Sequence, residues 1–342
     1  VCGIITILPP SRFDFFFIPD SSVVLGGYPQ GGEVNGPRDP HCNITILSGD
    51  INHDGDSTGN SFNVVKTRNY SETIVFDGFI IEHGNAIAAN EDGGGWWDGS
   101  LEDSAKLIIR NTTFRFNYAL SGAGFYGQGN RDLMVSNSEF HNNLAIIHGG
   151  GAYVGPVAVD GDTSLIRFEN VLWHHNEVTD PMGQGGGLAG IAGALTNEVI
   201  DIVNNTFTQN IPDAYANNSA GLVNIYNSIF WNTGIPPIAG TNVPSIFNSI
   251  VEGIVETMGN KNQNPLFQSP TSNFHLSQGS PAIDMGENSF STESTDLDGL
   301  PRIMRTIIDI GAYENLLYCF DDTIFVNADG TMPINLEDSI FK

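Results

Sequence analysis

The chain has 342 residues and a formal net charge of −26, so the protein is strongly acidic. Such a charge repels nucleic acid and anionic membrane surfaces, and it suits an exported protein or one that binds divalent cations. Charged residues make up only 15% of the chain and hydrophobic residues 40%, a balance that excludes a disordered chain. No apolar run is long enough to span a membrane.

Residues 1–62 are expected to form an N-terminal cap and the first coil of the fold. The three cysteines are Cys2, Cys42 and Cys319. A disulfide between Cys2 and Cys42 would lie within this cap and would leave Cys319 as the odd cysteine. The chain contains no CxxC pair, which argues against a structural zinc site.

An acidic loop in this region is a candidate metal site. Asp50, Asn52, Asp54 and Asp56 alternate as in the first half of a D-x-N-x-D-G loop, whose oxygen ligands converge on Ca²⁺. The acidic residue expected at the twelfth position is missing, because Ser61 stands there. Calcium binding by these residues is one hypothesis, and a polar turn on an acidic protein is the alternative.

One sequence unit, apolar-x-apolar-x-Asn-x-x-Phe-x-x-Asn, recurs through residues 63–255. Its copies lie at 74–84, 107–117, 133–143, 166–176, 200–210, 222–232 and 244–253, and the later copies are weaker. The earliest copy has Gly78 in place of the first Asn. A constant unit at variable spacing indicates one structural coil per repeat, with insertions in the loops.

The alternation within the unit is typical of β-strands and not of helices. The residues two before and three after the first Asn are apolar in every copy, so they are expected to face a common core. Short strands that cannot bury their faces alone stack into a solenoid, and the sequence therefore predicts an all-β fold of this kind. The first Asn of each copy is expected to stack along the axis with its side chain turned inward: Asn111, Asn137, Asn170 and Asn204.

Glycine-rich segments lie between the copies, at 93–97, 122–126, 149–153 and 185–189. Each predicts a second short strand that is entered through a tight turn. The first residue after the glycines should point inward (Trp96, Phe125, Ala152) and the next outward (Trp97, Tyr126, Tyr153). The outward residues would form an exposed aromatic column with rings about 4.8 Å apart. Such a column can bind sugar rings, and the alternative is a ladder that only supports the sheet.

A polar ridge is expected next to the inward aromatic of each unit. It places His141 and His174 on neighbouring coils, where they could bind a metal or act as acid and base. The sequence places no carboxylate as an obvious third member, so we interpret the ridge as a solvated face. A P-loop, a nucleophile elbow and an HExxH motif are absent from the sequence.

The motifs FRFN, FHNN and FTQN, together with the glycine-led segments, resemble the repeats of polymorphic outer-membrane proteins, which belong to the right-handed parallel β-helix proteins of bacterial surfaces. The stretch 264–314, with NPLFQSPTSNFHLSQGSPAIDMGENS, TDLDGLPRI and IDIGAYE, resembles the C-terminal closing segment of such proteins. Residues 316–342 resemble the first strands of immunoglobulin-like repeats in large surface adhesins. These resemblances imply a right-handed parallel β-helix over 63–255, a closing segment over 256–315, and the start of a further module or a linker over 316–342.

The sequence therefore favours a recognition domain of a secreted or cell-surface bacterial adhesin. The expected ligand is a glycan or another surface ligand, the expected cofactor is calcium, and the expected partners include other domains of the same longer protein. The alternatives are a carbohydrate-active enzyme, either a polysaccharide lyase or a glycoside hydrolase, and a purely structural spacer of a surface fibre. A groove with clustered carboxylates would favour the enzyme, and a ridged or flat aromatic face without them would favour the adhesin.

Overall fold

The computed structural model describes residues 3–32, 36–99, 105–129, 132–155, 164–190, 198–232 and 236–315. Within these residues the fold is all-β, and the helical segments are two short 3₁₀ turns at Ala86–Ala89 and Asn288–Phe290. The predicted immunoglobulin-like start at 316–342 lies outside the described residues.

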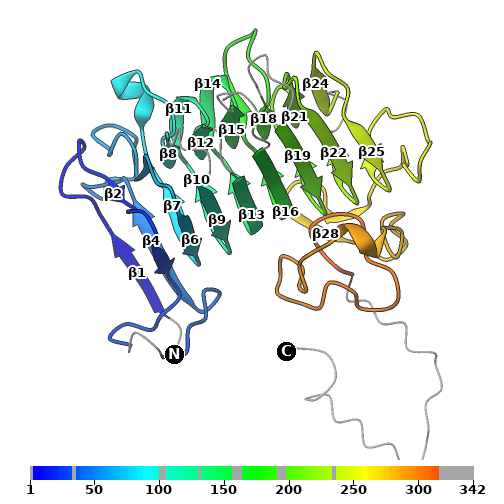
Figure 1. Cartoon of the computed structure of the whole chain (residues 1–342), viewed down its shortest axis with the longest axis horizontal. Coiled ribbons are helices and arrows are strands. Elements are labelled where there is room, and N and C mark those ends of the chain that lie inside the picture. Colours follow the sequence, from blue (N-terminus) through cyan, green and yellow to red (C-terminus); the bar gives the residue numbers. More distant parts are fainter. Residues whose placement is uncertain are drawn as a thin grey trace, which may run out of the picture.

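The largest sheet has 15 strands in two parallel columns that meet at a bend (Figure 1). The first column contains β3 (Val23–Leu25), β6 (Thr73–Asp77), β9 (Lys106–Arg110), β13 (Asp132–His141), β16 (Ser164–His174), β19 (Glu198–Val203), β22 (Leu222–Tyr226) and β25 (Ser245–Phe247). The second contains β1 (Gly3–Ile7), β4 (Asn43–Ser48), β7 (Ile80–Glu82), β10 (Thr113–Arg115), the ends of β13 and β16, β20 (Thr206–Thr208), β23 (Ile229–Trp231) and β26 (Ile250–Val251). The long strands β13 and β16 belong to both columns and join them into one sheet.

A second parallel sheet continues along the stack, and a third contributes strands to three successive coils. The glycine-led strands form an eight-stranded sheet of β2 (Phe16–Phe17), β5 (Val65–Thr67), β8 (Trp96–Asp98), β12 (Phe125–Gln128), β15 (Ala152–Gly155), β18 (Leu188–Gly190), β21 (Tyr215–Asn217) and β24 (Ile238–Gly240). A three-stranded sheet contains β11 (Tyr118–Ser121), β14 (Leu144–His148) and β17 (Glu177–Val178). The hairpin of β27 (Phe267–Ser269) and β28 (Asn273–Leu276) is antiparallel. Because the chain visits the parallel columns in the same order again and again, the arrangement is compatible with a parallel β-helix.

The predicted core columns are confirmed by the strand register. The residues three positions after the first Asn of each unit pair with one another in continuous register from strand to strand: Ile81, Phe114, Phe140, Trp173, Phe207, Phe230 and Val251. Their aromatic rings stack, with centroids 4.5 Å apart for Phe114 and Phe140 and 4.2 Å apart for Phe140 and Trp173. Trp96, Phe125 and Ala152 point into the same core, as predicted.

The first Asn of each repeat forms the bend. The predicted stacking along the axis is found for one pair, because Asn170 Nδ2 donates to Asn137 Oδ1 at 3.0 Å, whereas the predicted inward orientation of these two side chains is wrong. The backbone is left-handed there, with φ of 46° at Asn137 and 55° at Asn170, a conformation that asparagine tolerates better than most residues. Two of the side chains bond to groups outside the core: Asn111 Nδ2 donates to Asp77 Oδ1 at 2.8 Å, and Asn170 Nδ2 donates to the Thr295 carbonyl at 2.7 Å. Asn204 is fully buried. The repeated Asn is thus selected for its backbone conformation.

The inward amide ladder exists, but the second Asn of the unit forms it. Its members are buried and follow one another along the stack: Asn117, Asn143, Asn176, Asn210 and Asn232. Each side-chain oxygen accepts the backbone N–H of the preceding member, for example Asn143 N to Asn176 Oδ1 at 3.2 Å. The ladder satisfies the backbone donors at this turn, which would otherwise be buried without a partner.

The closing segment folds back onto the outside of the bend. Figure 1 shows β28 and the adjoining loops beside the ends of the long strands. The fully buried carboxylate of Glu169 accepts hydrogen bonds from the Thr292 backbone and hydroxyl, both at 2.6 Å, and from Glu293 N at 3.0 Å. Phe290 stacks on Tyr226 with ring centroids 4.0 Å apart. These contacts anchor the segment over the later coils.

An N-terminal segment crosses the earliest bend from the other side. Arg38 reaches Asp77, with Nη2 and Oδ1 2.8 Å apart. At Gly78, whose φ is 89°, a Cβ would lie 2.5 Å from Arg38 Nη2 and 3.0 Å from Pro40 Cγ, so glycine replaces asparagine in this coil. Cys42 is disulfide-bonded, and because Cys2 and Cys319 lie outside the described residues, the Cys2–Cys42 pairing stays a prediction.

Candidate functional site

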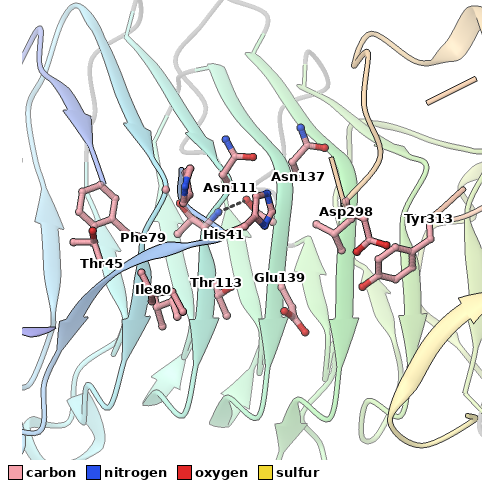
Figure 2. A pocket seen from close by; sticks show the side chains of 16 residues that line it. His41, Thr45, Phe79, Ile80, Asn111, Thr113, Asn137, Glu139, Asp298 and Tyr313 are labelled. Carbon is pink, nitrogen blue, oxygen red and sulfur yellow. Dashed lines mark hydrogen bonds between the residues drawn. The ribbon is translucent and has the colours of Figure 1, made fainter. Parts of the chain in front are cut away.

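A pocket of about 320 Å³ lies on the outside of the bend, between the two terminal segments. Its floor consists of the bends of three successive coils, at residues 78–80, 111–113 and 137–139. One wall consists of Pro40, His41, Ile44 and Thr45, and the other consists of Leu297, Asp298 and Tyr313 of the closing segment. Figure 2 shows Asp298 and Tyr313 at one end, Thr45 and Phe79 at the other, and Asn111, Asn137 and Glu139 between them.

The two terminal segments almost meet over the floor. A Cβ at Gly299 would lie 4.0 Å from His41 Nε2, so the space between the two segments at this point is about the size of one methyl group. Asn137 of the floor contacts the closing segment, because its Nδ2 donates to Glu293 Oε2 at 3.4 Å. The pocket is thus assembled from segments that are distant in sequence.

Glu139 is the carboxylate on the pocket floor. Its Oε1 accepts a hydrogen bond from His174 Nε2 at 2.7 Å, and its side chain remains 31% exposed. Burial alone would raise the pKa of Glu139, but the bond from His174 and the charges of His141 and Arg115 outweigh burial and lower the pKa. Glu139 is therefore ionised at neutral pH.

His174 is held in place on several sides. Its ring stacks on that of His141, with centroids 5.0 Å apart and parallel planes, and Phe274 of β28 packs against it at 5.0 Å. Burial lowers the pKa of His141. The predicted histidine pair thus exists, but the closing segment covers part of it, so the interpretation as a fully solvated ridge is wrong at this point.

Asp298 forms a second carboxylate–histidine pair on the opposite wall. Its Oδ2 lies 2.7 Å from His275 Nε2, and the His275 ring stacks on Tyr313 with centroids 4.0 Å apart. The aspartate side chain is 39% exposed. Burial is the main cause that raises the pKa of Tyr313 well above its ordinary value, so the phenol is a neutral hydrogen-bond donor. The floor and this wall therefore each offer a carboxylate that a histidine orients.

Apolar side chains form another part of the pocket surface. Ile44 and Ile80 contribute from strands, Phe79 from the bend, and Pro40 and Leu297 from the two segments. Oriented acceptors beside apolar surface are typical of pockets that bind small polar molecules. Its volume is near the lower end of the range for ligand pockets.

The predicted aromatic column has the predicted register. Tyr126 pairs with Trp97 on one side and with Tyr153 on the other, and the two tyrosine rings stack at 5.0 Å. Tyr126 is buried, with 9% exposure, whereas Trp97 and Tyr153 are half-buried, so the column is less exposed than predicted. Lys66 Nζ lies 5.6 Å from the centroid of the Trp97 ring. Ligand binding by this column stays a prediction.

The predicted calcium loop is an exposed turn stabilised by its own side chains. Asp50 Oδ2 accepts from Gly55 N at 3.1 Å, Asp54 Oδ1 accepts from Asp56 N at 3.0 Å, and Asn52 Nδ2 donates to Asp54 Oδ2 at 2.6 Å. Across the described parts of the chain, no group of three or more His, Cys, Asp or Glu side chains is placed to hold a metal ion. Calcium binding therefore stays a prediction.

Sequence reasoning missed four residues of the pocket: His41, Glu139, Asp298 and Tyr313. Glu139 could have been predicted as a neighbour of the histidine pair, because it lies two positions before His141 on the same strand and so points to the same face. The other residues belong to the terminal segments, and no repeat pattern indicates where those segments fold back.

Comparisons of the chain with protein-family models, with curated proteins and with solved structures give no match. The likeness to surface β-helix repeats therefore depends on the motifs alone. None of the helices among the described residues is long and apolar enough to cross a membrane.

Proposed function

We propose that the chain is a right-handed parallel β-helix domain of an exported surface protein and that it recognises carbohydrate. The recurrent order of the parallel columns and the two Asn positions of each repeat support the fold. The hand follows from the strong preference of parallel crossovers for right-handed connections. A disulfide at Cys42 and a net charge of −26 support export.

The pocket between the two terminal segments is the observation that carries this proposal. It combines acceptors on the floor and one wall, Glu139 and Asp298, with the Tyr313 phenol and with apolar surface. Sugars present the complementary pattern, because their hydroxyls donate hydrogen bonds and their CH groups pack on apolar surface. This pattern suits glycan recognition by an adhesin domain.

Glycoside hydrolysis is a second candidate, because two carboxylates line the same pocket. Glu139 is held ionised, so in such a reaction it would act as nucleophile or base, and Asp298 would have to donate the proton. A lyase for acidic glycans has less support, since neither Lys nor Arg is among the described residues that line the pocket. A purely structural spacer needs no ligand at all.

Calcium and the aromatic column belong to the proposal as separate elements. Calcium at Asp50, Asn52, Asp54 and Asp56 would stabilise the N-terminal region and would not touch the pocket. The column of Trp97, Tyr126 and Tyr153 lies on the eight-stranded sheet, whereas the pocket lies on the 15-stranded sheet. Variants can therefore separate the two surfaces.

A glycan array probed with the whole chain, with and without chelator, tests the proposal. Glu139→Gln should weaken binding to the glycans that the wild-type chain retains, and Trp97→Ala should leave it unchanged if the pocket is the site. The reverse result would place binding on the aromatic column. Release of reducing ends from the bound glycans would show that the protein is an enzyme. If no glycan on the array binds, the purely structural spacer is the function that remains.

A further inference from the structure

The charges around the pocket carry information about its ligand. The arginines close to its edge are already paired: Arg115 lies 2.6 Å from Glu82, and Arg110 and Arg38 both contact Asp77. The two carboxylates that line the pocket differ, because a histidine and not an arginine bonds each of them. The pocket lining therefore carries excess negative charge.

Each of these carboxylates also keeps one oxygen for a ligand. Glu139 uses Oε1 for His174, and Asp298 uses Oδ2 for His275. Within the described residues, Glu139 Oε2 and Asp298 Oδ1 accept no hydrogen bond, and both side chains are about one-third exposed (31% and 39%). An occupant of the pocket can therefore reach an acceptor on the floor and another on the wall.

We infer that the pocket selects a sugar that carries a protonated amino group, an inference that rests on the proposed glycan recognition. An ammonium group brings several N–H donors and the positive charge that the lining lacks. A neutral sugar provides donors but brings no positive charge to the two carboxylates. A uronate or a sulfated sugar would bring a further anion to a pocket without a Lys or Arg among its described lining residues, so it is excluded.

The test must distinguish the pocket from the general field of an acidic protein, which attracts any cation. Glu139→Gln and Asp298→Asn remove one charge each, and the amide oxygen can still accept the bond from the histidine. Glu72→Gln is the matched control, because Glu72 is exposed and does not line the pocket. Thermal melting of every variant verifies that it is folded.

The probes are glucosamine, glucose, N-acetylglucosamine and galacturonate, each titrated into the isotope-labelled whole chain and followed by amide chemical shifts. Glucosamine should bind about tenfold more tightly than glucose, in line with a charge-assisted hydrogen bond, and galacturonate should not bind. N-acetylglucosamine, which keeps the size but loses the charge, should behave like glucose or bind more weakly. The preference for glucosamine should shrink in Glu139→Gln and Asp298→Asn, persist in Glu72→Gln, and weaken with added salt.

Two results overturn the inference in different ways. If glucose binds as tightly as glucosamine, or if galacturonate binds, the pocket recognises sugars but does not select an amine, and the proposed function stands alone. If none of the four sugars shifts any amide of the pocket, both the inference and the proposed site are wrong. If the preference for glucosamine is unchanged in both pocket variants, it comes from the overall negative charge of the protein and not from the pocket.

Discussion

Asn176 is the member of the amide ladder whose removal tests the fold most sharply. Its Oδ1 accepts from Asn143 N and Nδ2, at 3.2 and 3.0 Å, and its own Nδ2 donates to the Phe140 carbonyl at 2.8 Å and to Asn210 Oδ1 at 2.9 Å. The side chain is fully buried. Asn176→Ala leaves the buried Asn143 N–H without this acceptor, at a cost of about 1–3 kcal/mol, and the other lost bonds and the cavity bring the expected loss to about 3 kcal/mol.

Urea unfolding measures the loss of stability, and hydrogen exchange at the Asn143 amide measures the local opening. Asn224→Ala is the control, because Asn224 is a half-buried strand residue with a single side-chain bond, to Asp201, and should cost less than about 1 kcal/mol. If Asn176→Ala costs no more than Asn224→Ala, or if the Asn143 amide keeps its protection, the ladder does not support the stack.

Three other predictions concern the terminal segments and the core. If the acidic loop binds calcium, a chelator should lower the Tm and Asp54→Ala should abolish that effect, whereas an unchanged melting curve would mean that the loop is only a turn. Burial alone would raise the pKa of Glu169, but Arg167 and the bonds from Thr292 and Glu293 outweigh it and lower the pKa, so this contribution to stability is present above the ordinary pKa of 4.5 and is lost as the pH falls below it. Limited proteolysis of the closing segment should accelerate in that acid range, and equal rates at pH values of about 3 and 7 would contradict the anchoring role. Burial raises the pKa of Glu198 from 4.5 to about 7, so the native state binds more protons than the unfolded state and this residue makes stability fall as the pH rises between those values. The difference in unfolding free energy between Glu198→Gln and the wild-type chain should therefore be more favourable to the variant at a pH of about 8 than at about 5. A difference that is the same at both pH values would show that Glu198 does not titrate between them.

The strand columns could be predicted because burial on one face imposes a period of two on every copy of the unit. Phe114, Phe140 and Trp173 occupy the same position in their repeats and stack in the structure. The roles of the two asparagines could not be separated in this way. Both occur at turns, and only the backbone conformation shows that Asn137 makes the bend while Asn143 makes the ladder.

The pocket could not be predicted, because it depends on where the terminal segments fold. Glu139 looked like one more outward residue of a strand until His174 and the closing segment were placed beside it. Asp298 and Tyr313 lie in a segment without repeats, whose contacts with the bend depend on particular groups such as Glu169. Gly78 was visible as a departure from the repeat, and its reason is the close approach of Arg38.

Glycan binding in the pocket between the two terminal segments can be tested directly. The most direct measurement is the map of amide chemical-shift changes in the isotope-labelled chain on titration with the glycan that it retains best on the array. If the glycan binds in the pocket, we expect saturable changes at Asn137, Glu139, Asp298 and Tyr313 and none at Trp97 or Tyr153. Saturable changes confined to the aromatic column, or the absence of any saturable change, would contradict it.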